Sequence, residues 1–476
     1  MRCPWYAPLL LVALLPCSGA DLAQRMDTLL EANANGKLGI AGISVIDLST
    51  GQPVFQKNAQ QLLLPASNLK ILTAAMAMEK LGADYRFHTR VLLDAAGNLV
   101  LVGSGDPSFS SRVYPYANGK HTPATLQAME ELTDQIAAAG VRRIDGDVIG
   151  DDRLYPWEPF PSSWTADDTL YGFGAPVSAL SFNDNVVEVI VTAGAKEGDA
   201  ARMAPSFAQI TAHNRVRTGP AGGRASIVQH KAGENEWTIS GTIPANGVGS
   251  VLELPVADPA EFAASALFDA LTRRGIAVRG RPVARHRVTG ETYAAPEGHE
   301  VAVRVSPPLE QILGAMLKVS QNLHAELLLR ESARATQREA SSDAGAKALT
   351  AFLQDRGGDP GEWRTEDGSG LARNDLATPQ LLARTLHQQY QAHGDSWIKL
   401  FPAGGAEGTL DHRLCCVSDG RGVWAKTGTL NRAVALSGYA KGSQGSMAFS
   451  VIVNNFSAST GEVQQWVDKI AVALLE

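Results

Sequence analysis

Three short motifs along this 476-residue sequence place serine, lysine and amide side chains in a fixed order. They are Ser67–Lys70 (SNLK), Ser320–Asn322 (SQN) and Lys426–Gly428 (KTG). A serine hydroxyl is a weak nucleophile at neutral pH, so it needs a base within hydrogen-bonding distance. The lysine three residues after Ser67 can be that base, and the other two motifs supply further groups for attack on an amide carbonyl. The set predicts a serine enzyme that transfers an acyl group.

Lys70 is the predicted general base for Ser67. Residues three apart on a helix lie on the same face, one turn away, and the sequence after Pro65 has a helical pattern with Gly82 as its expected C-cap. Burial beside a second cation, for which Lys426 is the obvious choice, lowers the pKa of such a lysine and leaves it partly neutral. A serine at a helix N-terminus also has backbone N–H groups that can face a developing oxyanion.

Two of the motifs occur twice, and their order along the chain separates the copies. Ser396–Lys399 repeats the Ser-x-x-Lys spacing, but it follows the Ser-x-Asn motif. Ser181–Asn183 repeats Ser-x-Asn among strand-like segments, whereas Ser320–Asn322 leads into a helical pattern. Each motif alone is also typical of a surface turn or a helix cap. We therefore predict that the first Ser-x-x-Lys and the second Ser-x-Asn belong to the site.

The Lys426–Gly428 motif has the composition of a carboxylate-binding strand edge. It stands at the end of a strand pattern, where an exposed backbone edge can pair with an extended peptide. Lys426 and Thr427 can hold a free carboxylate by charge-assisted hydrogen bonds. Gly428 permits a close approach because it has no side chain.

A sheet covered by helices is predicted from the two ends of the chain together. The segments with these patterns are a helix over 22–30, a hairpin of 40–46 and 53–55, strands over 422–425, 434–439 and 447–453, and a final helix over 462–475. The expected fold class is α/β (α+β). One catalytic domain is assembled from residues 21–87 and 300–476.

A β-rich insert is predicted between the two halves of this domain. About 250 residues separate Ser67 from Ser320, which is room for one or two further domains. Short strand-like runs alternate there with turns of Gly, Asn and Asp. We divide the region into an inserted domain II (88–180 and 255–299) and a nested domain III (181–254).

The composition is that of a soluble protein with a large core, because 45% of the residues are hydrophobic and 19% are charged. The net charge of −7 comes without a basic cluster, so nucleic acid is excluded as an expected partner. No stretch reaches the roughly 20 apolar residues of a membrane-spanning helix.

Residues 1–20 have the pattern of a signal peptide, with a charged start, a short apolar run and a small-residue cleavage site between Ala20 and Asp21. Export to a periplasm is the expectation. Removal of this segment leaves only the adjacent Cys415 and Cys416, which is too few for a disulfide framework. A metal site is disfavoured there because the second ligand pair of zinc spacing is missing. Whether the two cysteines are bonded stays open.

Four further segments extend the three motifs: Gly103–Pro107, Ala175–Leu180, Asp367–Arg373 and Gly408–Leu410. With them the mature chain resembles, over nearly its whole length, the periplasmic D-alanyl-D-alanine carboxypeptidase/endopeptidases. These are low-molecular-mass penicillin-binding proteins with a large insert between the first two motifs. The resemblance implies a penicillin-binding, serine β-lactamase-like transpeptidase domain with inserted β-rich domains.

The resemblance also implies the reaction. The expected activity is hydrolysis of D-Ala-D-Ala bonds in peptidoglycan stem peptides and cross-links through an acyl-enzyme on Ser67, with β-lactams as covalent inhibitors and no metal or organic cofactor. Lys70 takes the proton of Ser67, Ser320 passes a proton to the leaving amine, and Asn322 orients the substrate amide. The N–H groups of Ser67 and Thr429 form the oxyanion hole.

Four more residues match family positions near the substrate. Asp168 and Phe173 precede an Ala-Pro pair in the insert and are expected to reach the substrate's side chain, with the Asp168 carboxylate pairing with a free amine. Arg373 follows Asp-Gly-Ser-Gly-Leu-Ala, and Asn431 stands three residues after Gly428. Each of the four also has an ordinary alternative as a loop or core residue.

Two other functions stay open. A serine β-lactamase shares the three motifs, but no Glu-x-x-Leu-Asn stretch follows Asn322 to supply the deacylating Glu of class A enzymes. A non-catalytic peptidoglycan-binding protein could keep the pocket, although the intact Ser67 and Lys70 favour an enzyme. The preference between carboxypeptidase and endopeptidase substrates, and any association with the membrane surface or with a second copy, also stay open.

Overall fold

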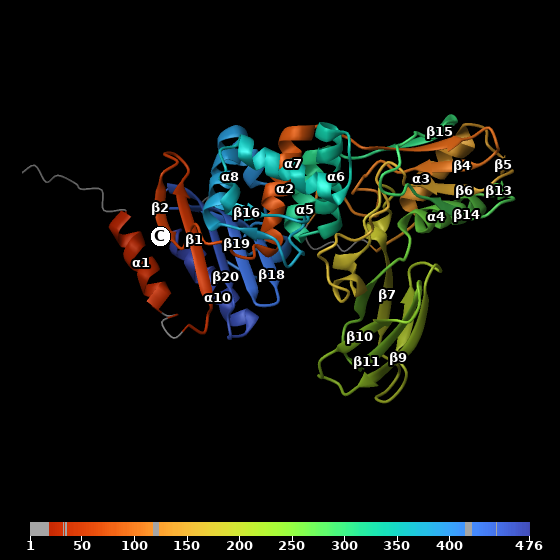
Figure 1. Cartoon of the computed structure of the whole chain (residues 1–476). Coiled ribbons are helices and arrows are strands. Elements are labelled where there is room, and N and C mark those ends of the chain that lie inside the picture. Colours follow the sequence, from red (N-terminus) through yellow and green to blue (C-terminus); the bar gives the residue numbers. More distant parts are fainter. Residues whose placement is uncertain (1–18, 32, 34–35, 118–122, 415–420, 444) are drawn as a thin grey trace, which may run out of the picture.

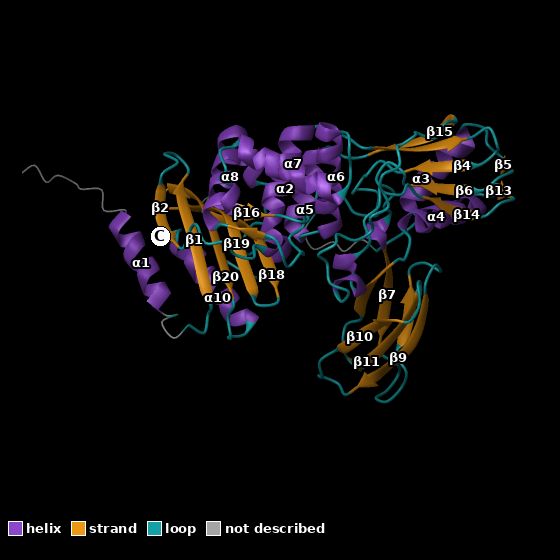
Figure 2. Cartoon of the chain, viewed as in Figure 1, coloured by secondary structure: helices purple, strands orange, loops and turns teal. Residues whose placement is uncertain are grey.

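The computed structural model of the protein describes residues 19–31, 33, 36–117, 123–414, 421–443 and 445–476. Figure 1 shows a helix-covered sheet built from the two ends of the chain, a second sheet at the far end of the molecule, and a lobe of strands that projects from the second part. Figure 2 shows the same division, with most helices on the first sheet and mainly strands in the projecting lobe.

The first sheet has five antiparallel strands in the order β18-β19-β20-β1-β2. Its strands are β1 (Ile40–Asp47), β2 (Pro53–Lys57), β18 (Gly422–Leu430), β19 (Ala433–Gly442) and β20 (Gly445–Asn454). β1 pairs with β20, so the N-terminal hairpin joins the C-terminal strands. The predicted fold class, an antiparallel sheet covered by helices, is confirmed.

Helices cover both faces of this sheet, and each face has its own core. α1 (Gly19–Glu31) and α10 (Thr460–Ala473) pack on one face, with Phe449 and Trp466 in one buried cluster. The cluster on the other face includes Tyr439 and Ile452 of the sheet. The helices on that face are α2 (Leu69–Leu81), α5 (Leu309–Val319), α6 (Asn322–Gln337), α7 (Ser342–Asp355), α8 (Pro379–His393) and α9 (Asp395–Ile398).

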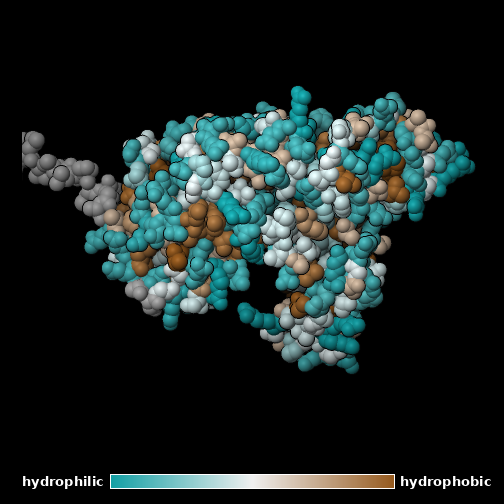
Figure 3. Space-filling model, in the orientation of Figure 1, coloured by the Kyte–Doolittle hydropathy of each residue, from teal (hydrophilic) through white to brown (hydrophobic). Residues whose placement is uncertain are grey.

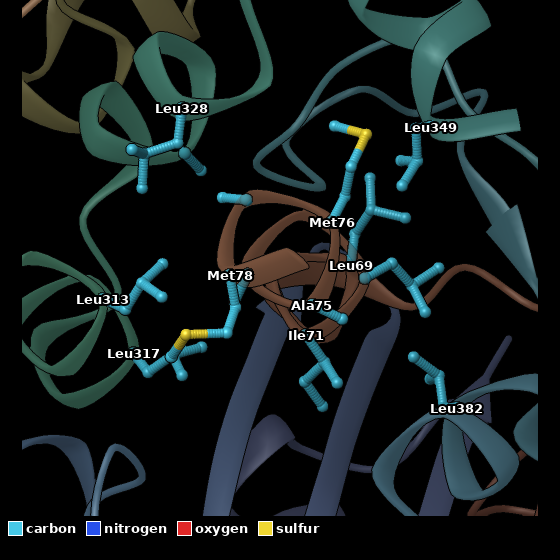
Figure 4. Packing of buried hydrophobic residues seen from close by; sticks show 14 of the residues in the cluster. Leu69, Ile71, Ala75, Met76, Met78, Leu313, Leu317, Leu328, Leu349 and Leu382 are labelled. Atoms are coloured by element: carbon cyan, nitrogen blue, oxygen red, sulfur yellow. The ribbon is translucent and has the colours of Figure 1, made fainter. Parts of the chain in front are cut away.

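α2 is the central helix of this layer. Every residue from Leu69 to Met78 is buried, and Figure 4 shows α5, α6, α7 and α8 contributing leucines around it. A helix that is apolar on all sides is stable only inside a core. The residues that follow Ser67 are therefore enclosed by close-packed side chains of the neighbouring helices.

The insert begins with a second five-stranded sheet in the order β14-β6-β4-β3-β15. Its strands are β3 (His88–Leu93), β4 (Leu99–Val102), β6 (Val148–Asp151), β14 (Pro282–Arg285) and β15 (His299–Val305). Alongside it lie α3 (Gln127–Ala138), α4 (Pro259–Arg273) and a short pair formed by β5 (Arg143–Ile144) and β13 (Ala277–Val278).

The projecting lobe contains two three-stranded sheets, β10-β11-β9 and β12-β7-β8. Its strands are β7 (Val186–Thr192), β8 (Arg202–Pro205), β9 (Thr211–Gly219), β10 (Ser226–Lys231), β11 (Glu236–Pro244) and β12 (Ser250–Pro255). In Figure 3 its tip is mostly hydrophilic on the visible face. One buried cluster contains both Val91 of the second sheet and Trp237 of the lobe, so the two share a core.

The strand pairing places one boundary of the insert differently from the sequence-based division. The prediction ended domain II at residue 299, but β15 pairs with β3 along its whole length, so this sheet extends to Val305. The strand joins the insert because Val301 and Ala302 are buried in the insert's core. The division of the insert into domains II and III stays a prediction.

Two sequence-based predictions lie outside the described residues, namely the signal peptide up to residue 18 and the state of Cys415 and Cys416. Within the described ranges, none of the helices has the length and apolarity needed to cross a membrane.

Candidate active site

Ser67 lies in a short 3₁₀ turn, η1 (Ala66–Asn68), that runs directly into α2. Ala66 has a left-handed φ of 47°, a conformation that costs free energy for a residue with a side chain. The side-chain amide of Asn68 donates a hydrogen bond to the backbone oxygen of Lys426 at 3.1 Å, which ties the turn to β18. Ser67 therefore stands at the N-terminal end of α2, as the helical pattern predicted.

Lys70 is the second residue of α2, one turn after Ser67, and its side chain is completely buried. Its Nζ contacts the Ser67 hydroxyl oxygen at 3.0 Å. The same Nζ donates to Asn322 Oδ1 at 2.6 Å and to the backbone oxygen of Ser369 at 2.6 Å. Three acceptors from three separate segments therefore fix the amine beside the serine.

Burial is the main cause of the low pKa of Lys70. Desolvation lowers its pKa from 10.5 to about 7, although the carboxyl groups of Asp367, Glu326 and Asp375 raise it. The sequence-based prediction expected burial beside the cation of Lys426 to lower this pKa, and the structure agrees on the burial and on the direction. An amine with a pKa of about 7 is neutral often enough at neutral pH to accept the proton of a serine.

Ser320 and Lys426 form the second polar pair of the site. Ser320 caps α5 in the left-handed conformation, with φ 64° and ψ 35°. Lys426 Nζ donates to Ser320 Oγ at 2.8 Å and to the Thr427 backbone oxygen at 2.7 Å. Burial, and then repulsion from Lys70, hold the pKa of Lys426 well below its usual value.

Asn322 is the first residue of α6, and its amide joins two parts of the molecule. Its oxygen accepts the hydrogen bond from Lys70. Its nitrogen donates at 2.8 Å to the backbone oxygen of Phe173, which lies in the turn η3 (Gly172–Gly174) of the insert. The insert therefore contacts the site directly through a backbone carbonyl.

β18 is the edge strand of the first sheet. The strand predicted over 422–425, with the Lys426–Gly428 motif at its end, is too short, because β18 continues through the motif to Leu430. Gly428 allows a close approach, but the segment that approaches is the nucleophile turn: a side chain at Gly428 would meet the Asn68 amide and the Pro65 oxygen, each at 2.8 Å. The strand therefore positions Ser67 in addition to presenting an open edge.

The Asp-Gly-Ser-Gly segment forms a tight loop behind Lys70. The Asp367 carboxylate accepts hydrogen bonds from the backbone N–H groups of Ser369, Gly370, Leu371 and Ala372 and from the Trp164 indole. Burial raises the pKa of Asp367, but side-chain and backbone hydrogen bonds outweigh that effect and leave its pKa lowered. Gly370 lies against the turn of Ser67, since a side chain there would meet the Ala66 oxygen at 2.0 Å.

Asp168 and Arg373 are brought together across 205 positions of sequence. Arg373 Nη2 donates to Asp168 Oδ1 at 3.2 Å, and Asp168 Oδ2 accepts from the backbone and the hydroxyl of Thr165. The Asp168 side chain is 7% exposed and that of Arg373 is 36% exposed. A buried carboxylate and a partly exposed guanidinium from distant parts of the chain thus form one ion pair.

The remaining site candidates are on the surface. The Phe173 ring is 47% exposed and stacks on Tyr171, with 5.3 Å between ring centroids. Thr429 is exposed in β18, and its hydroxyl accepts from Gln464 at 3.4 Å. Asn431 is exposed in the turn after β18.

The duplicate motifs lie apart from this cluster. Ser396 and Lys399 are both exposed, and the Ser396 hydroxyl donates to the backbone oxygen of His393. The Ser181 hydroxyl donates to the backbone oxygen of Ser178 inside the insert. Neither copy has the buried lysine that accompanies Ser67.

Sequence reasoning assigned no role to three acidic residues near Lys70. Asp367 was noted as part of a matching segment without a role, and Glu326 was not singled out. A signal for Glu326 existed, since an acidic residue four positions after Asn322 shares its helical face amid leucines. Asp375 gave no comparable signal.

A comparison with protein families shows to which family the chain belongs. The model of the D-Ala-D-Ala carboxypeptidase 3 (S13) family matches residues 22–474. The chain belongs to this family. The D-alanyl-D-alanine carboxypeptidase of Actinomadura sp. (strain R39) is 32% identical over 491 residues, which cover 98% of this chain and 87% of that protein. As a member of the S13 family, the chain is a hydrolase of the D-Ala-D-Ala carboxypeptidase type.

Solved structures share the fold. Penicillin binding protein 4 (dacB) from Haemophilus influenzae matches with a TM-score of 0.76 and 23% identity, covering 95% of this chain and 97% of that chain. A predatory peptidoglycan endopeptidase from Bdellovibrio bacteriovorus matches with a TM-score of 0.50 and 16% identity, covering 91% and 92%. The fold therefore recurs in proteins of low sequence identity.

Proposed function

We propose that this S13 family member cleaves the terminal D-Ala-D-Ala bond of peptidoglycan stem peptides through an acyl-enzyme on Ser67. The observation that carries the proposal is the 3.0 Å contact between Ser67 Oγ and the buried Nζ of Lys70. Neutral Lys70 takes the hydroxyl proton while Oγ bonds to the substrate carbonyl carbon. The backbone N–H groups of Ser67 and Thr429 stabilise the oxyanion.

Collapse of the tetrahedral intermediate breaks the C–N bond. The leaving nitrogen needs a proton, and Ser320 delivers its hydroxyl proton to it. The proton that Lys70 took from Ser67 then replaces the one that Ser320 gave, so both groups return to their starting state, while Lys426 donates a hydrogen bond to the Ser320 hydroxyl at 2.8 Å. Asn322 orients the substrate amide. Water then attacks the ester carbonyl while Lys70 takes its proton. The bond between the acyl carbon and Ser67 Oγ breaks, Lys70 returns that proton to Oγ, and the shortened peptide leaves with a free carboxyl group.

The substrate's free carboxylate is the expected partner of Lys426 and Thr427. Burial of a cation without a counter-charge is unfavourable, and an incoming carboxylate supplies that charge. Thr427 is held ready by a 2.9 Å contact between its hydroxyl and that of Thr409. The open edge of β18 can pair with the peptide backbone.

Cross-linked peptides and β-lactams are proposed as further reactants of the same serine. A solved structure of the Haemophilus influenzae protein is a complex with a β-lactam, and the similar protein from Bdellovibrio bacteriovorus is described as a peptidoglycan endopeptidase. Both reactants present an amide carbonyl to the nucleophile. We also propose export to the periplasm, where peptidoglycan is found, on the basis of the N-terminal segment.

Labelled penicillin tests the choice of nucleophile. Ser67→Ala is expected to abolish covalent labelling, and Ser396→Ala, the matched change in the exposed copy, is expected to leave it intact. Incubation with a D-Ala-D-Ala muropeptide and with a cross-linked dimer, followed by mass spectrometry, then separates carboxypeptidase from endopeptidase products. Labelling without product release from either peptide would support a binding protein instead.

A further inference from the structure

Glu326 is a buried carboxyl group that the proposed reaction does not use. It lies on α6 one turn after Asn322, and its side chain has no exposed surface. Its Oε1 accepts a hydrogen bond from the backbone N–H of Gly368 at 2.8 Å. Its Oε2 has no hydrogen-bond partner among the described residues. A buried acid with only one oxygen satisfied is costly, so its presence calls for a reason.

The hydrogen bond from Gly368 leads to the general base in two steps. Ser369 follows Gly368 directly, and the Ser369 carbonyl oxygen accepts from Lys70 Nζ at 2.6 Å. On the other side of Gly368, its carbonyl oxygen accepts from the Thr73 hydroxyl at 2.7 Å. The short backbone segment that holds Lys70 is therefore fixed by Glu326 at the N–H and by Thr73 at the carbonyl.

The same helix supplies a second acceptor for Lys70. The oxygen of Asn322 accepts from Lys70 Nζ at 2.6 Å, and Asn322 and Glu326 share one face of α6 because they are four residues apart. Residues of α6 thus fix two of the three acceptors around Lys70 Nζ. Asn322 is itself one acceptor, and Glu326 holds the Ser369 carbonyl through its hydrogen bond with Gly368. A shift of the 368–369 backbone would move one acceptor without the other and pull the amine away from Ser67.

The charged groups around Glu326 act on its protonation as well. Burial first, and then repulsion from Asp367, raise its pKa to about 8, while Arg330 and Lys70 lower it. Arg330 is also completely buried on α6, and its Nη2 donates to the backbone oxygen of Glu158 in the insert. Asp375, the other buried acid of this cluster, has a pKa raised by burial and then by Asp367.

We propose that Glu326 is a positioning residue for acylation: by holding the Gly368 N–H, it sets the Ser369 carbonyl so that Lys70 stays in contact with Ser67. This inference rests on the proposed function, because it takes Ser67 as the nucleophile. Accepting a hydrogen bond is the property that matters, and a neutral amide oxygen at this position meets the same need. The negative charge of Glu326 is not required.

Two substitutions at one position separate these properties. Glu326→Leu keeps most of the side-chain volume and removes the acceptor, whereas Glu326→Gln keeps an acceptor and removes the charge. The matched control is Glu331→Leu, a buried acid on the same helix that accepts hydrogen bonds from Tyr85, Tyr155 and Arg334. The second-order rate constant for acylation by labelled penicillin is measured for folded samples, with the unfolding temperature recorded for each.

We expect the acylation rate constant of Glu326→Leu to be at least tenfold lower than that of the wild type. The rate constant of Glu326→Gln should stay within about threefold of the wild-type value. Glu331→Leu lowers the unfolding temperature but keeps acylation within about twofold. A wild-type rate in Glu326→Leu, or an equal loss in Glu326→Gln and Glu326→Leu, overturns the inference. Labelling that persists in Ser67→Ala overturns the proposed nucleophile instead, so the two failures are distinguishable.

Discussion

At the scale of single residues, the site depends on two lysines that the fold buries completely. An ammonium group without water favours its neutral form, so burial lowers the pKa of both. Lys70 is faced by acids that moderate the effect, whereas Lys426 is faced by Lys70 and has no such compensation. Lys70 is thereby suited to accept a proton, whereas Lys426 is stabilised in its charged form only when an anion such as the substrate carboxylate comes beside it.

The pKa of Lys70 predicts the pH dependence of acylation. Lys70 loses its proton as the pH rises through about 7, and only the neutral amine can act as a base. The acylation rate constant should therefore increase about tenfold per pH unit below 7 and level off above it. Stopped-flow measurement with a chromogenic β-lactam between pH 5.5 and 9, on protein checked for folding at each pH, tests this. A rate independent of pH over that range would remove Lys70 as the base.

Lys426 is predicted to matter most for substrates with a free C-terminal carboxylate. Truncating one partner of a buried, hydrogen-bonded charge pair costs roughly 2–5 kcal/mol. Lys426→Ala should therefore lower kcat/KM for a D-Ala-D-Ala peptide by about 30-fold or more, since each 1.4 kcal/mol is about tenfold. The same peptide ending in a carboxamide is the comparison, and its loss should be much smaller. Equal losses for the two peptides would argue that Lys426 only supports Ser320.

At the scale of elements, the nucleophile turn η1 is held by close contacts with two neighbouring segments. β18 approaches it at Gly428, and the 367–370 loop approaches it at Gly370, where in each case a side chain would overlap the turn. The strained backbone of Ala66 lies between them. Such a conformation persists only where the surroundings determine it, and these two glycines allow the surroundings to come close enough.

Gly370→Ala is predicted to impair both stability and acylation. The new methyl group would overlap the Ala66 oxygen, and the φ of 77° is unfavourable for alanine. Gly357→Ala is the matched control, because Gly357 has a φ of 76° with no atom within 4 Å of the added carbon. Both variants should lose about 1–2 kcal/mol for the backbone conformation. Only Gly370→Ala should also acylate more than tenfold slower, which thermal unfolding and penicillin labelling together can establish.

Local patterns predicted the elements well and their tertiary roles poorly. The hairpin of β1 and β2 and the helix α2 follow from side-chain periodicity, which is a property of short segments. The end of β18 was placed too early, at residue 425, because the motif was expected to follow the strand, whereas in the fold β18 continues through the motif and Gly428 lets η1 come close. The role of Glu326 depends on a contact with a residue 42 positions away, which no local pattern reveals.

At the scale of the whole molecule, α6 connects the insert to the site. Its first residue carries the Asn322 amide, and its buried charged residues continue to the insert. Three hydrogen bonds cross this junction. Asn322 donates to the backbone oxygen of Phe173 and Arg330 donates to the backbone oxygen of Glu158, each at 2.8 Å. The Tyr155 hydroxyl donates to the Glu331 carboxylate at 3.1 Å. The insert is thus coupled to the catalytic helix at several points, and it can hold a recognition group at a fixed distance from Ser67.

Asp168 is the group of the insert that we predict to recognise the substrate. Its carboxylate already pairs with Arg373, so a free amine on the stem-peptide side chain would join an existing ion pair. Asp168→Asn should raise KM for the free-amine peptide by about tenfold or more, because a hydrogen bond to a charged group contributes roughly 1.5–3 kcal/mol. The N-acetylated peptide should lose much less, since it has no charge for Asp168 to meet.

The comparison of these two peptides is needed because Asp168→Asn also leaves Arg373 without its partner, which affects both substrates alike. Asp151→Asn is the matched control: Asp151 is a buried aspartate of the insert that pairs with Arg153, so its loss disturbs the insert without touching the proposed recognition group. The ratio of KM values for the free and acetylated peptides should change in Asp168→Asn and stay at the wild-type value in Asp151→Asn. If the ratio is unchanged in both, Asp168 supports the structure of the turn through Thr165 and Arg373, and recognition of the side chain must come from another part of the molecule.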